Sequence, residues 1–506
     1  MATVPEPSPC SVCRRPAGHR CGKCGRASYC GRPHQLADWP THKAECRRPP
    51  YELRECPTLG RHWVARDRVP AGRVLLEEKP LACGPKPASP PVCLACHARL
   101  RSAAHKCRGC GWPACDAGNS CGPHHSAAEC RLIAGHSPFG DNESFESCAS
   151  HSAYCFVLPL RCLLLEGDNR RAFRGLQSHL NERLDTALYR IYRVNLVQFV
   201  LDRLGMRASG LDDVDVLEAA AVLDTNSFEV RCGGGAKIRA VYAQASMMAH
   251  HCRPNTKHVF VDGGRWAIRV LATVAIGEGQ PVTATYTQSL WRTRERRKHL
   301  KAAKCFDCAC DRCTDPTEFG THLGSAVCSD CGGYVAPDRV ECSGGCGTEH
   351  DRVAYELKVA EAERRVRSFD RTDLQAFEDF LERQVYGPTR LFHCNHFVAV
   401  SVKYALTQLY NDRILDLSSK QLDNNVKICK ELLTLADVLD PGLTRFRGLL
   451  LYYIQQSLGR RLTMKPKRDD CRALIKKCRQ EAKSILITEP DLAHLVDLLP
   501  ITIKTV

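Results

Sequence analysis

Residues 10–46 read CSVCRRPAGHRCGKCGRASYCGRPHQLADWPTHKAEC, and the spacing of cysteine and histidine in this stretch decides how it folds. A Cys-x2-Cys pair at a tight turn places two thiolates on one tetrahedral zinc ion. A segment this short cannot bury a sufficient core, so metal binding supplies its folding free energy. The order of soft ligands predicts two structural zinc sites, formed by Cys10, Cys13, Cys21, Cys24, Cys30, His34, His42 and Cys46.

Three further cysteine clusters follow along the chain. The second predicts two more zinc sites and contains Cys93, Cys96, Cys107, Cys110, Cys115, Cys121 and Cys130, with His124 or His125 as the last ligand. We favour His125. The third cluster comprises Cys305, Cys308, Cys310 and Cys313; three of these thiols are well placed, and the site needs a distant fourth ligand. The fourth is typical of a zinc ribbon and comprises Cys328, Cys331, Cys342 and Cys346.

Composition narrows the class of protein. The chain has 506 residues, 32 cysteines and a formal net charge of +16, so we expect three or four domains. The first ten residues, MATVPEPSPC, contain no apolar signal segment, and no apolar stretch is long enough to cross a bilayer. We therefore expect a protein inside the cell, where cysteines stay reduced and bind metal. The positive charge favours an acidic partner, although about six thiolate-bound zinc ions would lower it to about +7.

Hydrophobic patterning separates a mixed N-terminal part from a helical C-terminal part. Residues 58–82 predict two short strands around a turn at 70–72, and residues 152–223 have helical periodicity. Short strands return at 256–262 and 266–274. From residue 352 onward the pattern is helical, and paired helices of this length suggest a TPR-like stack; we expect them at 395–409, 418–436, 444–458 and 471–485.

Four short motifs accompany this order of segments. They are NSF at 226–228, MMAHHCRPNT at 247–256, GEGQPVTATY at 277–286 and the Cys-x-Cys-x2-Cys segment at 306–313. With the first cluster and its ADWP…H…EC ending, they resemble the SET and MYND domain (SMYD) protein family, most closely its arthropod branch. The resemblance covers nearly the whole chain.

The resemblance implies an α+β multidomain fold, in which a SET β-fold is interrupted by a second MYND-like finger. The expected segments are a disordered tail (1–9), MYND finger 1 (10–48), the first part of the SET fold (51–92), the inserted finger 2 (93–130), a helical insertion (131–223), the SET core (224–290), the post-SET zinc segment (291–315), the zinc ribbon (326–350) and a helical TPR-like domain (351–506).

The resemblance also implies a function, namely transfer of a methyl group from S-adenosylmethionine to a lysine of a histone or another protein. Tyr286 matches the family's catalytic tyrosine, and Cys252 matches the distant fourth ligand of the post-SET zinc. The residues that match cofactor contacts are Gly60, Arg61, His62, Asn226, His250 and Phe306.

Two departures from the family pattern bear on activity. Ala249 replaces an asparagine whose side chain hydrogen-bonds the cofactor, and this loss costs roughly 1.5–3 kcal/mol of binding free energy. His62 replaces the second glycine of the cofactor loop, which is unfavourable if the backbone there needs a positive φ. We infer weakened cofactor binding.

Two alternative functions remain open. The first is a catalytically weak adaptor in transcriptional regulation, which recruits proline-rich peptides through its MYND fingers and partners through the helical domain. The second is weak direct contact with DNA, motivated by the basic run Arg292, Arg294, Arg296, Arg297, Lys298, Lys301 and Lys304. We favour a solvated helix face for this run. We expect a monomer in the nucleus and cytoplasm, without membrane contact.

Overall fold

The computed structural model describes residues 9–21, 27–115, 122, 124–140, 145, 154–232, 236–261, 266–337, 339–388, 390–464 and 470–497. The predicted ligands Cys24 and Cys121, and residues 1–8 of the predicted tail, lie outside these residues.

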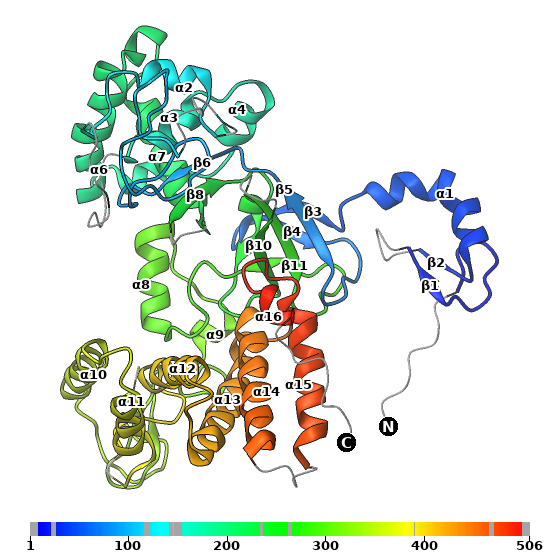
Figure 1. Cartoon of the computed structure of the whole chain (residues 1–506), viewed down its shortest axis with the longest axis vertical. Helices are drawn as coiled ribbons and strands as arrows, with labels where there is room; N and C mark the ends of the chain where they lie inside the picture. Colours follow the sequence, from blue (N-terminus) through cyan, green and yellow to red (C-terminus); the bar gives the residue numbers. More distant parts are fainter. Residues whose placement is uncertain are drawn as a thin grey trace.

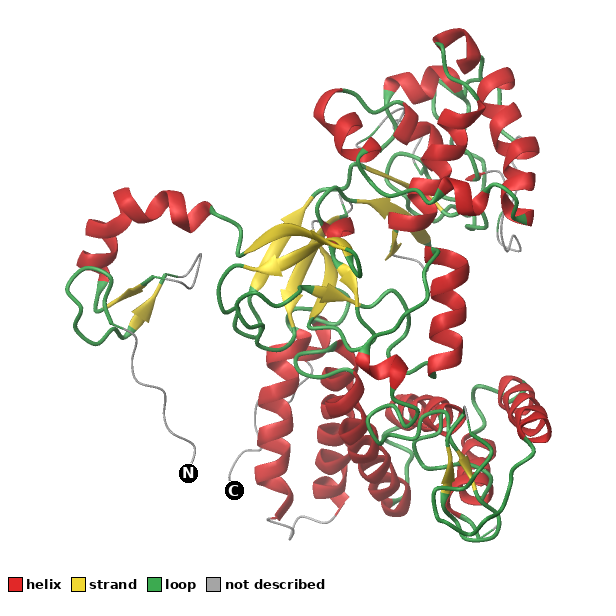
Figure 2. Ribbon diagram, turned by 180° about the vertical axis from the view of Figure 1, so that it is seen from behind, coloured by secondary structure: helices red, strands yellow, loops and turns green. Residues whose placement is uncertain are grey.

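The chain is an α+β multidomain protein, as predicted (Figure 1). Strands β3–β12 form a central β region, and helices α2–α7 lie on one side of it. Helices α10–α16, which we call the helical column, lie side by side on the opposite side. The N-terminal module projects from the β region at the end of helix α1, which is clear from both sides of the molecule (Figure 2). No helix among the described residues has both the length and the apolar character needed to cross a membrane.

The N-terminal module contains a two-stranded ribbon, β1 (His19–Arg20) and β2 (Ser28–Tyr29), followed by helix α1 (Arg32–Arg47). Its core is very small: the Tyr29 ring packs among the cysteines of the first cluster, and its hydroxyl donates to Asp38 Oδ2 at 2.7 Å. So little apolar burial fits the expectation that metal binding stabilises this module.

The central β region is assembled from short strands that are far apart in sequence. One hairpin, one parallel pair and two three-stranded sheets, ordered β10-β11-β5 and β6-β8-β7, make it up. The bounds are β3 (Tyr51–Cys56), β4 (Gly60–Ala65), β5 (Val74–Glu78), β6 (Ala82–Pro85), β7 (Phe228–Arg231), β8 (Lys237–Val241), β9 (Ala249–His250), β10 (Thr256–Val261), β11 (Ala267–Ala272) and β12 (Thr283–Ala284). The strands predicted at 256–262 and 266–274 are thus confirmed as β10 and β11.

The parallel pair β9–β12 places Ala249 opposite Thr283 and His250 opposite Ala284. It therefore brings the two motifs at 247–256 and 277–286 side by side. This is the step of the fold that builds the candidate active site.

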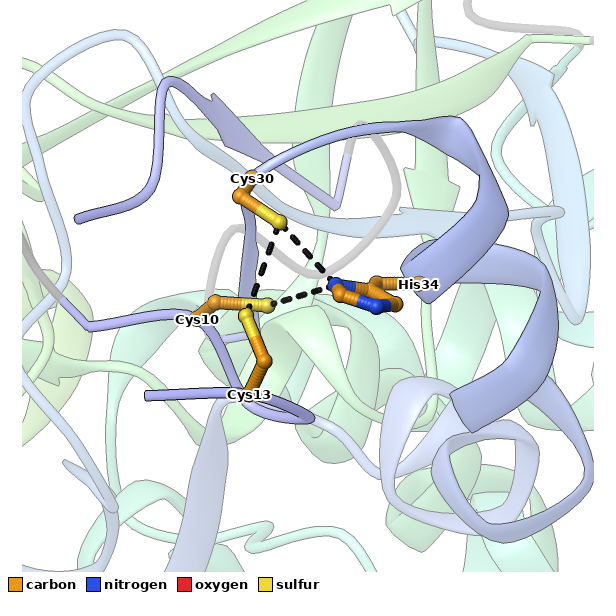
Figure 3. Close-up of side chains that lie close together, drawn as sticks. All are labelled: Cys10, Cys13, Cys30 and His34. Carbon is orange, nitrogen blue, oxygen red and sulfur yellow. Dashed lines mark hydrogen bonds between the residues drawn. The ribbon is translucent and has the colours of Figure 1, made fainter. Parts of the chain in front are cut away.

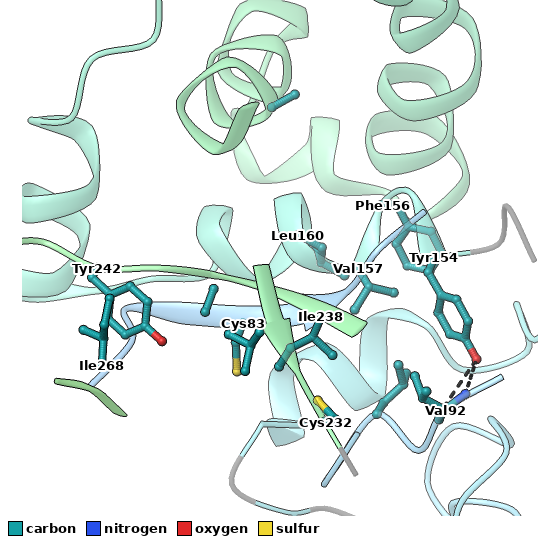
Figure 4. Close-up of a cluster of buried hydrophobic side chains, with 14 of the residues drawn as sticks. Cys83, Val92, Tyr154, Phe156, Val157, Leu160, Cys232, Ile238, Tyr242 and Ile268 are labelled. Atoms are coloured by element: carbon teal, nitrogen blue, oxygen red, sulfur yellow. Dashed lines mark hydrogen bonds between the residues drawn. The ribbon is translucent and has the colours of Figure 1, made fainter. Parts of the chain in front are cut away.

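The inserted segment after β6 shares one core with the helices that follow it. Helix α3 places Val157 and Leu160 against Cys83 and Ile238 of the sheet β6-β8-β7 (Figure 4). Tyr154 accepts a hydrogen bond from Val92 N at 3.0 Å, which fixes the start of the insertion. The helices here are α2 (Ala127–Leu132), α3 (Val157–Leu163), α4 (Gly167–Arg174), α5 (Leu180–Arg183), α6 (Ala187–Tyr192), two π-helical turns η2 (Arg193–Val197) and η3 (Phe199–Arg203), η4 (Met206–Ser209) and α7 (Asp213–Asn226).

After the short 3-10 turn η6 (Ala245–Met247) and strand β12, the chain runs through α8 (Thr293–Lys304) and α9 (Asp311–Thr314) into a small ribbon, β13 (Ala326–Val327) and β14 (Tyr334–Val335). The remaining helices are α10 (Arg352–Arg367), α11 (Leu374–Leu381), the π-helical turn η7 (Glu382–Tyr386), α12 (Phe397–Asp412), α13 (Ser419–Leu439), α14 (Arg445–Met464), α15 (Asp470–Leu486) and α16 (His494–Asp497). Helices α12–α15 confirm the four helices predicted from periodicity.

The helical column docks on the β region at the turn between α13 and α14. Gly442 has φ +85° and lies against the Thr273 carbonyl, which accepts a hydrogen bond from Leu443 N at 2.9 Å. An ion pair between Lys257 and Glu489, 2.6 Å long and largely buried, makes a second tie.

Candidate metal centres and active site

The first metal centre lies in the N-terminal module. Cys30 Sγ and Cys10 Sγ lie 3.0 and 3.6 Å from His34 Nδ1, and Cys13 Sγ lies 3.6 Å from Cys30 Sγ (Figure 3). Thiolates at about 2.3 Å from a tetrahedral zinc ion are about 3.8 Å apart. These four side chains are therefore gathered closely enough to bind one zinc ion.

The other predicted ligands of this module gather at a second point. Cys21, His42 and Cys46 are all buried, their ligand atoms lie within 4.8 Å of one another, and the Cys21 and Cys46 sulfurs are 3.7 Å apart. The fourth predicted ligand, Cys24, is outside the described residues.

The structure separates the two histidines that the sequence left as alternatives. His125 Nε2 lies 3.4 Å from Cys110 Sγ and 3.8 Å from Cys107 Sγ, and joins them in a buried cluster with Cys130. His124 instead contacts Cys83 Sγ at 3.1 Å and stacks on the ring of His97. The geometry therefore favours His125 as the ligand.

A buried carboxylate lies next to the second ring nitrogen of His125. Glu129 Oε1 lies 3.3 Å from His125 Nδ1, and the same carboxylate accepts two hydrogen bonds, at 2.9 and 3.0 Å, from Arg161 of helix α3. A metal-bound histidine commonly donates its second N–H to such a carboxylate. Sequence reasoning missed Glu129, although its i+4 spacing from His125 at the start of a helix was a usable signal.

The remaining ligands of the inserted finger form a separate group. Cys96 Sγ lies 3.6 Å from Cys115 Sγ, and Cys93 lies beside both. The predicted fourth member, Cys121, is outside the described residues.

The third centre joins the β region to the segment after α8. Cys252 Sγ lies 3.4 Å from Cys313 Sγ and 3.9 Å from Cys308 Sγ, and Cys310 completes the cluster. Beneath it lies a buried triad in which Glu318 bridges Arg296 and Arg312, at 2.6 and 2.9 Å. Arg312 also donates to the Cys252 carbonyl at 3.0 Å, so the triad holds both ends of the cluster.

The fourth centre is the predicted ribbon. Its thiols pair across the site, with Cys328 and Cys346 sulfurs 3.7 Å apart and Cys331 and Cys342 sulfurs 3.4 Å apart. Four thiols at this spacing suit a structural zinc ion.

The candidate active site lies beside the β9–β12 pair. The ring of His250 is 5.1 Å from that of Tyr286 and 5.9 Å from that of Phe306. His250 Nδ1 accepts a hydrogen bond from Tyr286 N at 3.0 Å, which locks the two residues together. Desolvation by burial lowers the pKa of His250 to about 4, so its ring is neutral at pH 7.

Tyr286 is the predicted catalytic residue. Its hydroxyl donates a short hydrogen bond to the Met248 carbonyl. Burial raises the pKa of Tyr286 to about 12, which keeps the hydroxyl protonated at neutral pH. The side chain is thus a fixed hydrogen-bond donor to the carbonyl of Met248, the residue before β9.

The other predicted cofactor residues are spread around this centre. Asn226 ends helix α7, and its amide nitrogen donates to the carbonyls of Gln177 and Val222, both at 2.7 Å. The Arg61 guanidinium donates to the Gly175 carbonyl at 2.6 Å. The Asn226 and Arg61 side chains are therefore bonded within the chain.

The backbone at Gly60 and His62 corrects one of the two reasons given for weak cofactor binding. Gly60 has φ +62°, which favours glycine. His62 is inside β4 without a positive φ, is buried, and lies with Nδ1 2.9 Å from the Gly60 carbonyl. The backbone therefore accommodates His62 without strain, and only the bulk of its side chain distinguishes it from glycine.

A large cavity of about 1070 Å³ lies between the β region and the helical column. Thr285, the neighbour of Tyr286, lines it together with His258 from β10 and Tyr404 and Tyr453 from the helices. The cavity thus leads from the interdomain surface to the residue next to the candidate catalytic tyrosine.

These features describe a protein whose cysteine-rich metal centres flank a small β region that contains a partly buried tyrosine next to a buried histidine. Comparison with known proteins agrees with the zinc-binding part of this description, because residues 10–46 match the model of the MYND finger family. Over 60% of its length the chain is 29% identical to the SET domain-containing protein SmydA-8, isoform A, of Drosophila melanogaster, covering 66% of that protein. It is also 35% identical, over 20% of its own length and 23% of the other, to the human histone-lysine N-methyltransferase SMYD3.

The chain carries a MYND finger, and the predicted resemblance to SMYD proteins is confirmed by relatives of that name. It spans just under two thirds of the length of SmydA-8. Among solved structures, the SET domain of LSMT bound to lysine and AdoHcy aligns with 92% of this chain and 90% of its own, at 12% identity and a TM-score of 0.29. A superposition this poor does not assign a structural role to any residue of the chain.

Proposed function

We propose that the chain is an S-adenosylmethionine-dependent protein-lysine N-methyltransferase that acts on a histone or another protein. The observation that carries this proposal is the meeting of Tyr286, His250 and Phe306 beside the β9–β12 pair. These are the residues that the SET motifs assign to catalysis and cofactor contact, and they come from three separate parts of the chain.

S-adenosylmethionine supplies an electrophilic methyl group when it is bound. The residues of the chain supply position and protonation state, which carry much of an in-line displacement. Tyr286 offers a protonated hydroxyl beside the Met248 carbonyl, and His250 stays neutral. A lysine amine has a pKa near 10.4 in water and must lose its proton to attack, which a desolvated site favours.

The substrate protein would enter through the interdomain cavity, because its lining reaches Ala284 and Thr285 next to Tyr286. Arg231, Lys257 and Arg445 line it together with Glu363 and Glu489. Charges of both signs suit a polar peptide segment that carries the target lysine.

The proposal is tested by calorimetric titration of the zinc-loaded protein with S-adenosylmethionine, followed by transfer of a labelled methyl group to histones and to a cell lysate. We expect binding by the native protein, and methyl transfer that Tyr286→Phe abolishes without loss of binding. Absence of binding at high micromolar cofactor, with zinc content intact, would overturn the proposal.

A second candidate function is that of an adaptor with little or no catalysis. It is favoured by Ala249, which is buried in β9 and offers no side-chain donor, and by the exposed Leu36 and Trp39 of helix α1, 62% and 38% accessible, which could receive a proline-rich peptide. The adaptor function is supported if Tyr286→Phe leaves the cellular phenotypes that depend on this protein unchanged while Cys30→Ala abolishes them.

The basic run along helix α8 supports DNA binding less well than its sequence suggested. Arg292 and Arg296 are buried in ion pairs with Glu295, Glu356 and Glu318, so they are not available to phosphate. Only part of the run, including Arg297 and Lys298, faces solvent. A flat dependence of DNA affinity on salt would remove this candidate. A location in the nucleus and cytoplasm remains a prediction.

A further inference from the structure

Lys304, the last residue of helix α8, places a cation at the candidate active site. Its ammonium lies 5.7 Å from the centre of the Tyr286 ring. It donates to the carbonyl oxygens of Thr225 at 2.6 Å and Asp224 at 3.2 Å, in the last turn of α7 next to Asn226. The charge is therefore fixed between the candidate catalytic tyrosine and a candidate cofactor residue.

The surroundings of Lys304 disfavour its charge. Desolvation is the largest cause, and the guanidinium groups of Arg239 and Arg183 add to it, while Asp224 and Cys305 oppose it; together they lower the pKa of Lys304 to about 8. Arg183 and Arg239 are themselves held in place, by the Ala303 carbonyl at 2.9 Å and the Asp224 carboxylate at 3.0 Å. The lysine is mostly protonated at pH 7 and mostly neutral above pH 9.

We propose that Lys304 is a specificity-determining residue whose fixed charge opposes a second cation at Tyr286, and so weakens binding of the sulfonium cofactor relative to its uncharged thioether product. The inference rests on the proposed function, since it concerns the same site. S-adenosylmethionine and S-adenosylhomocysteine share their amino, carboxylate and adenosine groups, and they differ in the methyl group and its positive charge. Their affinity ratio therefore reports the electrostatic environment of the sulfur atom.

The size of the effect follows from Coulomb's law. Two unit charges about 6 Å apart repel enough to change an affinity about threefold at the dielectric constant of water, and about a hundredfold at an effective value near 20. Removal of the lysine charge should therefore change the ratio of the two dissociation constants by at least about threefold.

The test measures dissociation constants for both nucleosides at pH 7 by calorimetry, with the native protein, Lys304→Met and the control Lys301→Met. Lys301 lies one turn earlier on α8 and pairs with Asp307 at 3.1 Å in solvent. We expect Lys304→Met to strengthen binding of S-adenosylmethionine, relative to binding of S-adenosylhomocysteine, at least about threefold. Lys301→Met should leave the ratio of the two dissociation constants unchanged. An unchanged ratio in Lys304→Met, with both nucleosides bound, overturns the inference alone.

A second arm keeps the inference testable if Lys304→Met does not fold. In the native protein, binding of S-adenosylmethionine relative to S-adenosylhomocysteine should become stronger as the pH rises from 7 to 9. A constant ratio of the two dissociation constants contradicts the inference. Because the Cys305 thiol also faces Lys304, the profile is repeated with Cys305→Ala, which must keep the shift. Failure of both nucleosides to bind a zinc-loaded protein at any pH overturns the proposed function and this inference with it.

Discussion

Replacement of Glu318 by glutamine should open the segment that closes the third metal centre. Glu318 lies between Arg296 and Arg312, with side-chain exposures of 4%, 0% and 0%. Its other oxygen accepts a hydrogen bond from Thr293 N at 3.0 Å, at the start of α8. The carboxylate therefore pairs with two buried guanidinium groups and also caps the start of helix α8.

The glutamine variant keeps the shape of the side chain but leaves both guanidinium groups without their carboxylate partner. Breaking a buried ion pair in this way costs about 3–5 kcal/mol, so protection of backbone amides in residues 289–318 should fall roughly a hundredfold to several thousandfold. Hydrogen exchange followed by mass spectrometry measures this directly, and the zinc content shows whether the Cys252 cluster survives.

Asp202→Asn provides the matched control. Asp202 also pairs with an arginine, Arg207, at 3.0 Å, but both side chains are about half exposed. Exposed pairs contribute less than about 1 kcal/mol, so this variant should leave exchange nearly unchanged. The reasoning is refuted if Glu318→Gln alters protection less than tenfold.

Three further predictions concern other parts of the chain. In Gly442→Ala, the added Cβ would lie 2.1 Å from the Thr273 carbonyl oxygen, on a backbone with φ +85°. The helical column should therefore detach from the β region and unfold as a separate thermal transition. In the control Gly459→Ala the added Cβ meets nothing within 4 Å, so the midpoint of thermal unfolding should not fall. Glu129→Gln should weaken zinc retention at the Cys107 centre about tenfold to a hundredfold in a chelator competition, and unaltered retention would show that Glu129 does not orient His125. Burial depresses the pKa of His396 far below its usual value. The unfolded state therefore binds a proton that the folded state does not, and the free energy of unfolding should fall as pH drops below about 6.5. The variant His396→Asn retains a side-chain cap for α12, and it should make the urea midpoint less dependent on pH.

The long C-terminal helices could be predicted because their information is local. Helix α13 begins after Ser418, whose side chain forms a reciprocal capping box with Gln421, and its apolar stripe repeats at helical spacing. The predicted range 418–436 differs from the observed helix by one residue at its start and three at its end.

The parallel pairing of β9 with β12 could not be predicted from local patterns, because each strand has only two residues and the partners are 34 positions apart. The two motifs were visible, but only tertiary packing brings them together. Lys304 was hidden for the same reason: on sequence it belongs to a basic solvent face, and its place beside Tyr286 depends on the carbonyls that end α7.

The third metal centre has a consequence for how the chain is made. Cys252 precedes its partners Cys308, Cys310 and Cys313 by more than fifty residues. Ribosomes add about 5–20 residues per second, so the Cys252 thiol waits several seconds for the rest of its ligands. During the first part of that interval strand β9, which carries His250, is already synthesised but its partner β12 is not. Zinc supply and thiol protection during translation should therefore set the yield of correctly closed protein.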